Sequence, residues 1–308
     1  MVTTTIKPTR NKQSKTSRSI FSAYLELTKP YIVVLLIFTT VTAMVIAAQG
    51  QALNPLVLAA TILGGSMAAA GSSALNQYID RDMDCKMTRT RTRPIPSGRI
   101  APINALLFGL ALLAWSMLIL GTLVNWLTAA LALIGAIYYV VVYTILLKRN
   151  TVVNILIGGG AGAMPVLVGW AAVNGRLDVQ VFLLFAIIFY WTPPHSWALA
   201  LLVNSDYAQA NVPMMPVARG PEVTRVQILL YSTQLVVLTL LPLPFRMLGL
   251  FYTIVAFLLG AGLLFEAVRL LRETTKVAAR RTYKYTTMYL AMLFLAMIID
   301  QVVFRVVR

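Results

Sequence analysis

Residues 56–84 read LVLAATILGGSMAAAGSSALNQYIDRDMD, an apolar run that ends in a group of polar oxygens. The apolar part is long enough to form a helix that crosses roughly 30 Å of hydrocarbon. Asn76, Asp80 and Asp84 are spaced by four, which rotates each by only about 40° on an α-helix, so they share one face. Asp82 falls on the other face. Because Mg²⁺ accepts such oxygens together with substrate phosphates, the stretch predicts a transmembrane helix ending in a magnesium–diphosphate site.

The composition of the whole chain is that of an all-α, polytopic membrane protein. Of its 308 residues, 59% are hydrophobic and 12% are charged, and the mean hydropathy is +0.78. Apolar stretches of spanning length predict nine helices, at about 31–49, 56–75, 103–122, 124–146, 152–173, 179–202, 226–244, 248–270 and 285–304.

The net charge of +16 does not indicate nucleic-acid binding, because the basic residues are sorted by membrane side. Of the 26 Lys and Arg residues, all except Arg176, Arg246, Arg305 and Arg308 lie before the first span or between an even-numbered span and the next. By the positive-inside rule, the amino terminus and these loops are cytoplasmic and the carboxyl terminus is outside. We expect the cell (inner) membrane; the basic, Ser/Thr-rich start leaves a mitochondrial inner-membrane location as the alternative.

The chain reads as one membrane domain over residues 26–308, preceded by a basic cytoplasmic tail over residues 1–25 that we expect to be disordered. No loop is long enough to bury a core of its own. Cys85 is the only cysteine, which excludes an intrachain disulfide and a cysteine-rich metal site.

Arginines follow the first acidic motif in the segment KMTRTRTRPIPSGRI. Guanidinium groups suit phosphate oxygens because their planar donors bind two oxygens at once. We expect one or two of these arginines, Arg89 and Arg93 foremost, to contact an anionic substrate. The alternative is ordinary positive-inside charge or attraction to anionic lipid.

Asp206 supplies the second acidic position, at the cytoplasmic end of the sixth predicted span. It could face the first acidic motif across the bundle. His195, the only histidine, lies in the same span directly after Pro193 and Pro194. An ionisable residue inside a span is a functional candidate by default, and a buried histidine bonded to backbone is the alternative.

Tyr143, Lys148 and Asn154 lie around the short connection between the fourth and fifth spans and can reach the same interface. Glycines 158, 159, 160 and 162 then begin the fifth span. Missing side chains there allow either close helix packing or room for a flat ligand.

Four segments resemble the UbiA superfamily of intramembrane prenyltransferases, and most closely its heme-farnesylating branch: NQYIDRDMDCKMTRTRTRP (76–94), YTILLKRNTVVNILIGGGAGAMPVLVGW (143–170), WTPPHSWALAL (191–201) and DYAQANVPMMPV (206–217). The resemblance covers about residues 25–300. The chain departs from it at Asn204 and Ser205, where the branch usually has Lys-Asp, and at Ser196, where an aromatic residue is usual.

The resemblance implies nine helices around a central cavity that opens to lipid and is capped by the two acidic loops. The activity it implies is transfer of a farnesyl group from farnesyl diphosphate to the 2-vinyl group of heme b, giving heme o. Heme b is then a substrate, Mg²⁺ the cofactor, and a heme A synthase or terminal-oxidase assembly protein a further candidate partner. The implied magnesium ligands are Asn76, Asp80, Asp84 and Asp206.

The same resemblance assigns the remaining site residues. Lys148 adds fixed positive charge and Tyr143 orients or shields the allylic carbon, alongside Asp80 and Asp84 in catalysis. The expected substrate-binding residues are Arg89, Arg93, Asn154, His195 and Tyr207. His195 is expected to contact heme b, either through its iron or through a propionate.

Two other classes stay open on the residues alone. A sister prenyltransferase acting on an aromatic acid or quinone precursor would share the diphosphate site and differ in the acceptor pocket. A transporter should carry charges along a path through its helices, whereas the spans hold few besides His195, Glu266 and Asp300. We expect Glu266 to pair with Arg269, and Asp300 with Arg305.

Overall fold

The computed structural model describes residues 19–304, and this part of the chain contains helices and no strand. The order of elements is α1 (Ile20–Thr28), α2 (Pro30–Ala47), α3 (Pro55–Ile79), α4 (Arg81–Lys86), α5 (Pro102–Leu123), α6 (Trp126–Ile137), η1 (Tyr138–Leu147), α7 (Asn154–Asn174), α8 (Val179–Leu202), α9 (Asn204–Gln209), α10 (Met215–Ala218), α11 (Gly220–Leu240), α12 (Leu250–Glu273), α13 (Lys276–Ile299) and η2 (Asp300–Phe304).

Nine helices within the described residues are long and apolar enough to cross a membrane, which confirms the predicted number. α6 continues into η1 as one span, and α13 continues into η2 as another. The seventh and ninth spans begin earlier than predicted, at Gly220 and Lys276 instead of about 226 and 285. Their first turns carry charged residues that a search for apolar residues passes over.

Local signals explain several helix starts. Proline is the first residue of α2, α3 and α5, where its fixed φ suits a helix and its missing N–H is not needed. The side chains of Asn54 and Asn125 accept hydrogen bonds from the first free amides of α3 and α6. Pro94 and Pro96 lie in the turns between α4 and α5, as expected from their inability to continue a helix.

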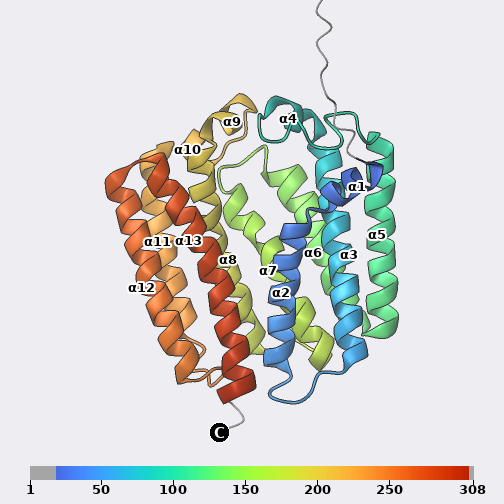
Figure 1. The fold of residues 1–308 in the computed structure, drawn as a ribbon, viewed down its shortest axis with the longest axis vertical. Helices are drawn as coiled ribbons and strands as arrows, with labels where there is room; N and C mark the ends of the chain where they lie inside the picture. The colour runs from blue at the N-terminus through green and yellow to red at the C-terminus, as the bar shows by residue number, and fades with distance from the viewer. Residues whose placement is uncertain (1–18, 305–308) are drawn as a thin grey trace, which may run out of the picture.

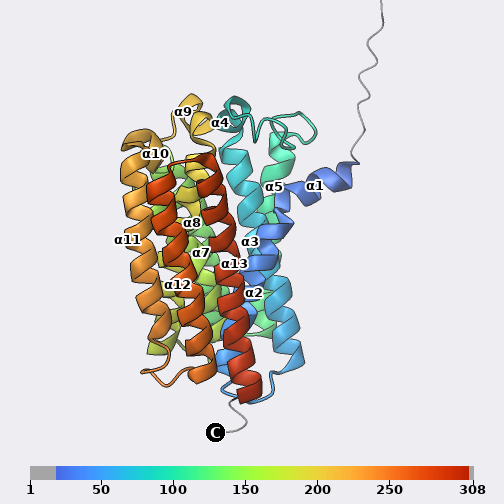
Figure 2. The same cartoon turned by 60° about the vertical axis from the view of Figure 1, so that its left-hand side comes forward.

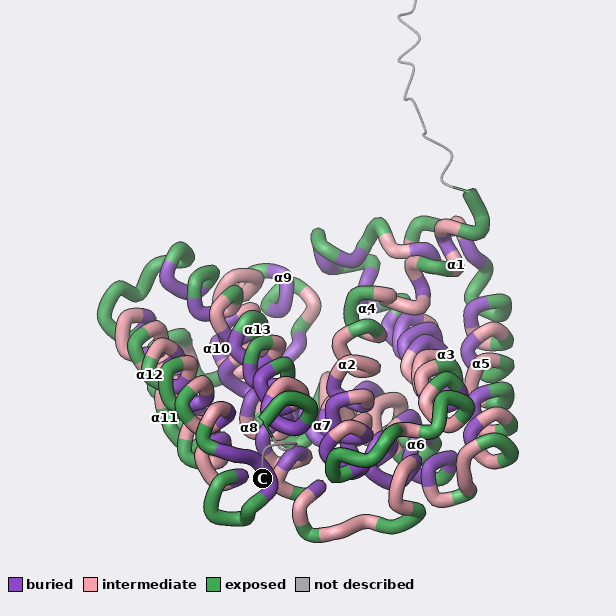
Figure 3. Tube along the Cα trace, turned by 60° about the horizontal axis from the view of Figure 1, so that its bottom comes forward, coloured by how far each residue is buried: buried purple, intermediate pink, exposed green. Residues whose placement is uncertain are grey.

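The spans close into a ring (Figures 1 and 3). Each span packs against the next along the chain, and α13 packs back against α2. α7 lies between the α2–α6 side and the α8–α13 side of the bundle (Figure 1) and is the most buried of the nine spans. Large apolar side chains such as Trp126, Phe257 and Phe265 are exposed on the outside, where lipid replaces water.

Short helices gather at one end of the bundle, opposite the end where the described chain finishes at Phe304 (Figures 1 and 2). α4, α9 and α10 cover this end, and α1 runs outward from it (Figure 2). Ile20 and Phe21 on α1 are exposed, whereas Ala23 and Leu27 pack against the loop before α5. The expected tail over residues 1–25 therefore overlaps a helix; residues 1–18 lie outside the described part of the chain.

Two polar residues that the sequence placed inside spans have structural partners. Glu266 Oε2 lies 2.6 Å from Arg269 Nη2, which confirms that pair. Asp300 has backbone partners in the structure, and its expected pair with Arg305 stays a prediction. Its carboxylate accepts hydrogen bonds from Gly249 N at 2.6 Å and Tyr252 N at 3.2 Å, so it caps the start of α12, and Arg305 lies outside the described residues.

Candidate active site

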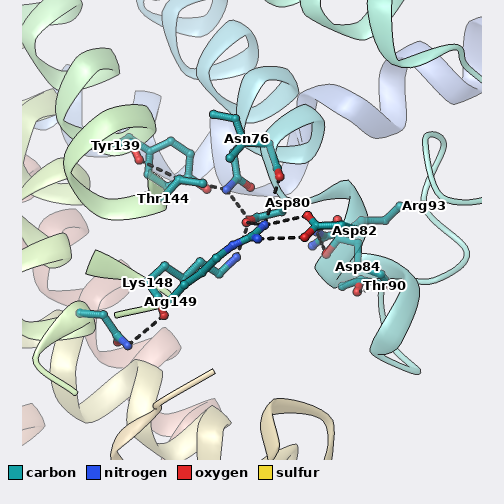
Figure 4. Close-up of polar contacts among 12 residues, drawn as sticks. Asn76, Asp80, Asp82, Asp84, Thr90, Arg93, Tyr139, Thr144, Lys148 and Arg149 are labelled. Atoms are coloured by element: carbon teal, nitrogen blue, oxygen red, sulfur yellow. Dashed lines mark hydrogen bonds and ion pairs between the residues drawn. The ribbon is translucent and has the colours of Figure 1, made fainter. Parts of the chain in front are cut away.

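The first acidic motif keeps helical spacing across the α3–α4 junction. The amide of Asp80 bonds to Asn76 O at 2.9 Å and the amide of Asp84 bonds to Asp80 O at 2.8 Å. Asn76, Asp80 and Asp84 are almost fully buried, whereas 62% of the Asp82 side chain is exposed. The structure therefore confirms that Asn76, Asp80 and Asp84 lie on one buried face and that Asp82 lies outside it (Figure 4).

Cationic side chains from two other elements already neutralise the buried carboxylates (Figure 4). Lys148 Nζ donates to Asp80 Oδ2, and Arg93 Nη1 donates to both oxygens of Asp84, at 2.9 and 2.8 Å. Pairing is what makes carboxylates tolerable in a site with so little water. Burial lowers the pKa of Lys148, while Asp80 acts in the opposite direction.

Arg149 binds the exposed carboxylate. Its two terminal nitrogens lie 2.9 and 2.8 Å from the oxygens of Asp82, and Nη2 lies 3.5 Å from Asp80 Oδ1. The hydrogen bond from Arg149 lowers the pKa of Asp82 to about 2. Asp82 thus pairs with Arg149 at the exposed rim, and Arg149 links this pair to Asp80 on the buried face.

Lys29 is a residue of this site that sequence reasoning missed, because it was counted only among the basic residues before the first span. It forms the bend between α1 and α2 with φ 51° and ψ 63°, a left-handed conformation that is costly for lysine. Its Nζ donates to Asn76 Oδ1 at 3.0 Å. Burial, with Arg93 and Lys148 nearby, lowers the pKa of Lys29 to about 7.

A π-helix, η1, supplies the wall opposite the acidic motif. Its wider turn places Tyr139 and Tyr143 with their rings stacked, centroids 5.7 Å apart. Thr144 Oγ1 accepts from Asn76 Nδ2 at 3.1 Å and donates to Tyr139 O at 2.8 Å, so this wall is tied to α3. Asn76 Nδ2 also donates to Asp80 Oδ2 at 2.8 Å. With Lys29 donating to Oδ1, both the nitrogen and the oxygen of the Asn76 amide have partners.

The second acidic loop meets the first through Arg89. The amide of Arg89 donates to Asp206 Oδ2 at 3.2 Å, and its side chain hydrogen-bonds to Tyr207, whose pKa is raised by burial. Asn154, at the start of α7, is fully buried, and its Nδ2 donates to Thr151 O at 2.7 Å and approaches Pro213 O at 3.5 Å. Asn154 therefore connects the turn that carries Lys148 to the segment after Asp206.

A cavity of about 410 Å³ opens below this polar end and is enclosed by α2, α3, α6, η1, α7, α8 and α13. Lys29 and Tyr143 line its polar end, and Trp191 and His195 line its wall on α8. Its volume is within the usual range for a small-molecule site, and most of its surface is apolar. Ser196 also faces it.

The glycines of α7 serve both purposes that the sequence left open. A Cβ at Gly158 would overlap the ring of Tyr143, so this glycine allows η1 and α7 to pack closely. Gly162 has no atom near its missing Cβ and lines the cavity, so it provides open space.

The oxygens at the polar end suit a hard divalent cation. Asp80 Oδ1 is buried and accepts no hydrogen bond, although Arg149 lies near it. Asp80 and Asp84 offer carboxylates from one face, which is the donor chemistry that Mg²⁺ prefers. Between residues 19 and 304, however, no three His, Cys, Asp or Glu side chains are grouped closely enough to hold one metal ion. The four-residue magnesium cluster that includes Asp206 therefore stays a prediction.

These features are those of an intramembrane prenyltransferase, and the comparisons with known proteins agree. The model of the UbiA prenyltransferase family matches residues 36–297, and the chain belongs to this family. It is 50% identical over 286 residues to a protoheme IX farnesyltransferase of Roseiflexus castenholzii, covering 93% of this chain and 53% of that protein. It thus spans about half the length of that relative. It is 48% identical to a protoheme IX farnesyltransferase of Microcystis aeruginosa, covering 91% of this chain and 89% of that protein.

Solved structures share the fold. A structure reported for digeranylgeranylglyceryl phosphate synthase aligns with a TM-score of 0.76 at 19% identity, over 92% of this chain and 99% of that one. A UbiA homologue from Archaeoglobus fulgidus bound to DMAPP and Mg²⁺ aligns with a TM-score of 0.65 at 18% identity, over 89% and 99% of the two chains.

Proposed function

We propose that this chain transfers the farnesyl group of farnesyl diphosphate to the 2-vinyl group of heme b and so forms heme o. Relatives named protoheme IX farnesyltransferase, at 50% and 48% identity, support the choice of both substrates. The observation that carries the proposal is the single cavity that joins Lys29, beside the buried carboxylates, to His195 on α8. An anionic donor and a large apolar acceptor need these two environments side by side.

The polar end is proposed to receive the diphosphate. Asn76, Asp80, Asp84 and Asp206 would hold Mg²⁺, which when bound neutralises negative charge on the leaving diphosphate. Lys148, Arg93 and Arg89 supply fixed positive charge at the same end, which is worth most where water is excluded. The carbon–oxygen bond of the donor breaks there, and its electron pair leaves with the diphosphate.

The tyrosines of η1 are proposed to flank the carbon that becomes cationic. Tyr143 and Tyr139 line the cavity with their rings stacked on each other, and the faces of aromatic rings attract cations. The terminal vinyl carbon of heme b then bonds to farnesyl C1. A water oxygen adds to the other vinyl carbon and loses one proton, which gives the hydroxyethylfarnesyl group of the product.

Two substrate-binding assignments take more specific forms. Tyr207 is proposed to act by holding the Arg89 side chain toward the diphosphate, given their hydrogen bond. Asn154 is proposed to position Lys148 through the backbone of the intervening turn, since its Nδ2 donates to backbone carbonyls of that turn, while its buried Oδ1 accepts no hydrogen bond. We further propose that the polar end faces the cytoplasm in a bacterial cell membrane, in line with the distribution of Lys and Arg.

Expression of the chain in a cell that lacks heme o tests this proposal. Mass spectrometry of extracted hemes should detect heme o, and Asp80→Ala should abolish it. A prenylated aromatic acid or quinone precursor as product, with heme b unchanged, would instead assign the chain to a sister prenyltransferase.

A further inference from the structure

His195 is held between two aromatic rings at the cavity wall. Its ring is stacked against Trp191, with centroids 4.4 Å apart, and against Tyr283 of α13, with centroids 4.7 Å apart. Trp191 is itself fixed, because its Nε1 donates to Thr286 O at 2.7 Å. Since both faces of the imidazole are covered, only its edge is available to a ligand in the cavity that it lines.

The hydrogen bonds of Thr286 favour one tautomer of His195. Thr286 Oγ1 lies 2.8 Å from Tyr283 O, a carbonyl that can only accept, so the single hydroxyl hydrogen is used there. Thr286 Oγ1 also lies 3.0 Å from His195 Nδ1. In that arrangement the second contact takes its hydrogen from Nδ1, which corresponds to the neutral tautomer with a lone pair on Nε2.

Among the described residues, no donor hydrogen-bonds to the lone pair on Nε2. His195 makes one hydrogen bond among the described residues, through Nδ1, and none through Nε2. The cavity that it lines is mostly apolar, so the lone pair faces few donors. A neutral imidazole of this tautomer cannot donate to a propionate from Nε2, but it can give its electron pair to a metal ion.

We propose that His195 binds the iron of heme b through Nε2, and that Thr286 is the positioning residue that keeps Nδ1 protonated and the ring oriented. This inference rests on heme b being the acceptor, as proposed above. It gives the acceptor end of the cavity a fixed point of attachment for the heme iron. The hydrogen bond from Thr286 would orient His195 as outer partners orient metal-ligating histidines in other proteins.

The test uses the full chain in detergent, titrated with ferrous heme b and followed by resonance Raman spectroscopy. The wild type should show an iron–histidine stretching band that His195→Ala loses, together with at least about a tenfold weaker heme affinity. Added imidazole should restore an iron–imidazole band in His195→Ala, because it can enter the space that the substitution leaves. A structural role for His195 would produce neither the loss nor the rescue.

Thr286→Val tests the positioning role, because valine keeps the shape of threonine and removes the hydroxyl. It should shift the iron–histidine band and weaken heme binding by about tenfold, whereas Thr286→Ser should behave like the wild type. Thr287→Val is the matched control. Thr287 Oγ1 donates to the same Tyr283 carbonyl at 3.0 Å but lies on the exposed side of α13 away from His195, so the band should not move.

Three results separate the inference from the proposed function. A wild type that forms heme o but whose Raman band is absent, or survives in His195→Ala, overturns the axial-ligand assignment alone. A band that Thr286→Val and Thr287→Val leave equally unchanged overturns the positioning role. A wild type that neither binds heme b nor forms heme o overturns the proposed function, and the inference with it.

Discussion

The two ends of the cavity differ in the side chains that form them: paired charges form one end and aromatic rings form the other. At the α3–α4 end, the buried carboxylates of Asp80 and Asp84 are already paired with Lys148 and Arg93, although Asp80 Oδ1 accepts no hydrogen bond. At the α8–α13 end, aromatic rings surround one histidine that makes one hydrogen bond. The first arrangement suits any diphosphate, because its charges can exchange protein partners for a ligand. The second suits one acceptor, because a single nitrogen is left to recognise it.

If the two ends act separately, substitutions at the polar end should abolish transfer and leave heme binding intact. Asp80→Ala should lower kcat/KM by roughly a thousandfold or more, because it removes a buried carboxylate beside the leaving diphosphate. The same is expected of Asp84→Ala and Asp206→Ala. Farnesyl transfer and heme titration of the purified variants measure the two effects independently.

Asp82→Ala is the matched control for this series, since Asp82 lies on the exposed side and pairs with Arg149. It should cost no more than about tenfold in transfer. Equal damage from Asp82→Ala and Asp84→Ala would contradict the shared-face interpretation, and loss of heme binding in Asp80→Ala would show that the two ends are coupled.

Lys29→Ala should have the next largest effect. It removes the donor to Asn76 Oδ1 and a positive charge next to Asp80 and Asp84, so we expect kcat/KM for farnesyl diphosphate to fall by about 10- to 100-fold. Isothermal titration with inorganic pyrophosphate and Mg²⁺ should show weaker binding. Lys86→Ala, which changes an exposed lysine of α4, should bind pyrophosphate as the wild type does.

Gly158→Ala tests the close packing of η1 against α7 beside the polar end. The added methyl group must displace the Tyr143 ring or separate η1 from α7, and overpacking of this kind costs about 1–3 kcal/mol. Transfer should fall by about tenfold while heme affinity is retained. Gly162→Ala is the counterpart, because its methyl group enters open cavity and should leave the melting temperature unchanged.

The smallest effect on transfer is expected at Asp300, far from both ends of the site. Asp300→Ala removes the cap of α12 and should destabilise the protein by about 1–3 kcal/mol, as seen for buried acceptors and caps. Thermal unfolding in detergent should report this loss. Activity per folded molecule should stay at the wild-type level, and a selective loss of transfer would contradict a purely structural role.

The sequence predicted those features that depend on a single helix. The nine spans follow from apolar length, and the burial of Asp80 and Asp84 with Asp82 exposed follows from a spacing of four. The pairing of Glu266 with Arg269 follows from a spacing of three.

Features that depend on contacts between distant segments could not be predicted in this way. Lys29 contacts Asn76 across a bend in the left-handed region, which no local pattern of charge reveals. Thr286 meets His195 from a helix much later in the chain. Asp300 accepts hydrogen bonds from backbone amides at the start of α12, which lies far from it in the sequence. The π-helix η1 contacts α3 through Thr144 and α7 through its tyrosines, and no local pattern in its sequence distinguishes it from an ordinary α-helix.

The closure of the ring by α13 against α2 has a consequence for the order of assembly during synthesis. The α3–α4 carboxylates and their partners on η1 and on the loop before α5 emerge early and can pair with one another. His195 emerges later but still lacks Thr286 and Tyr283, which arrive with the last helix. Contacts of such long sequence separation form late. A nascent chain therefore completes the polar end of the cavity first, and it cannot hold His195 in its observed orientation until α13 has been inserted.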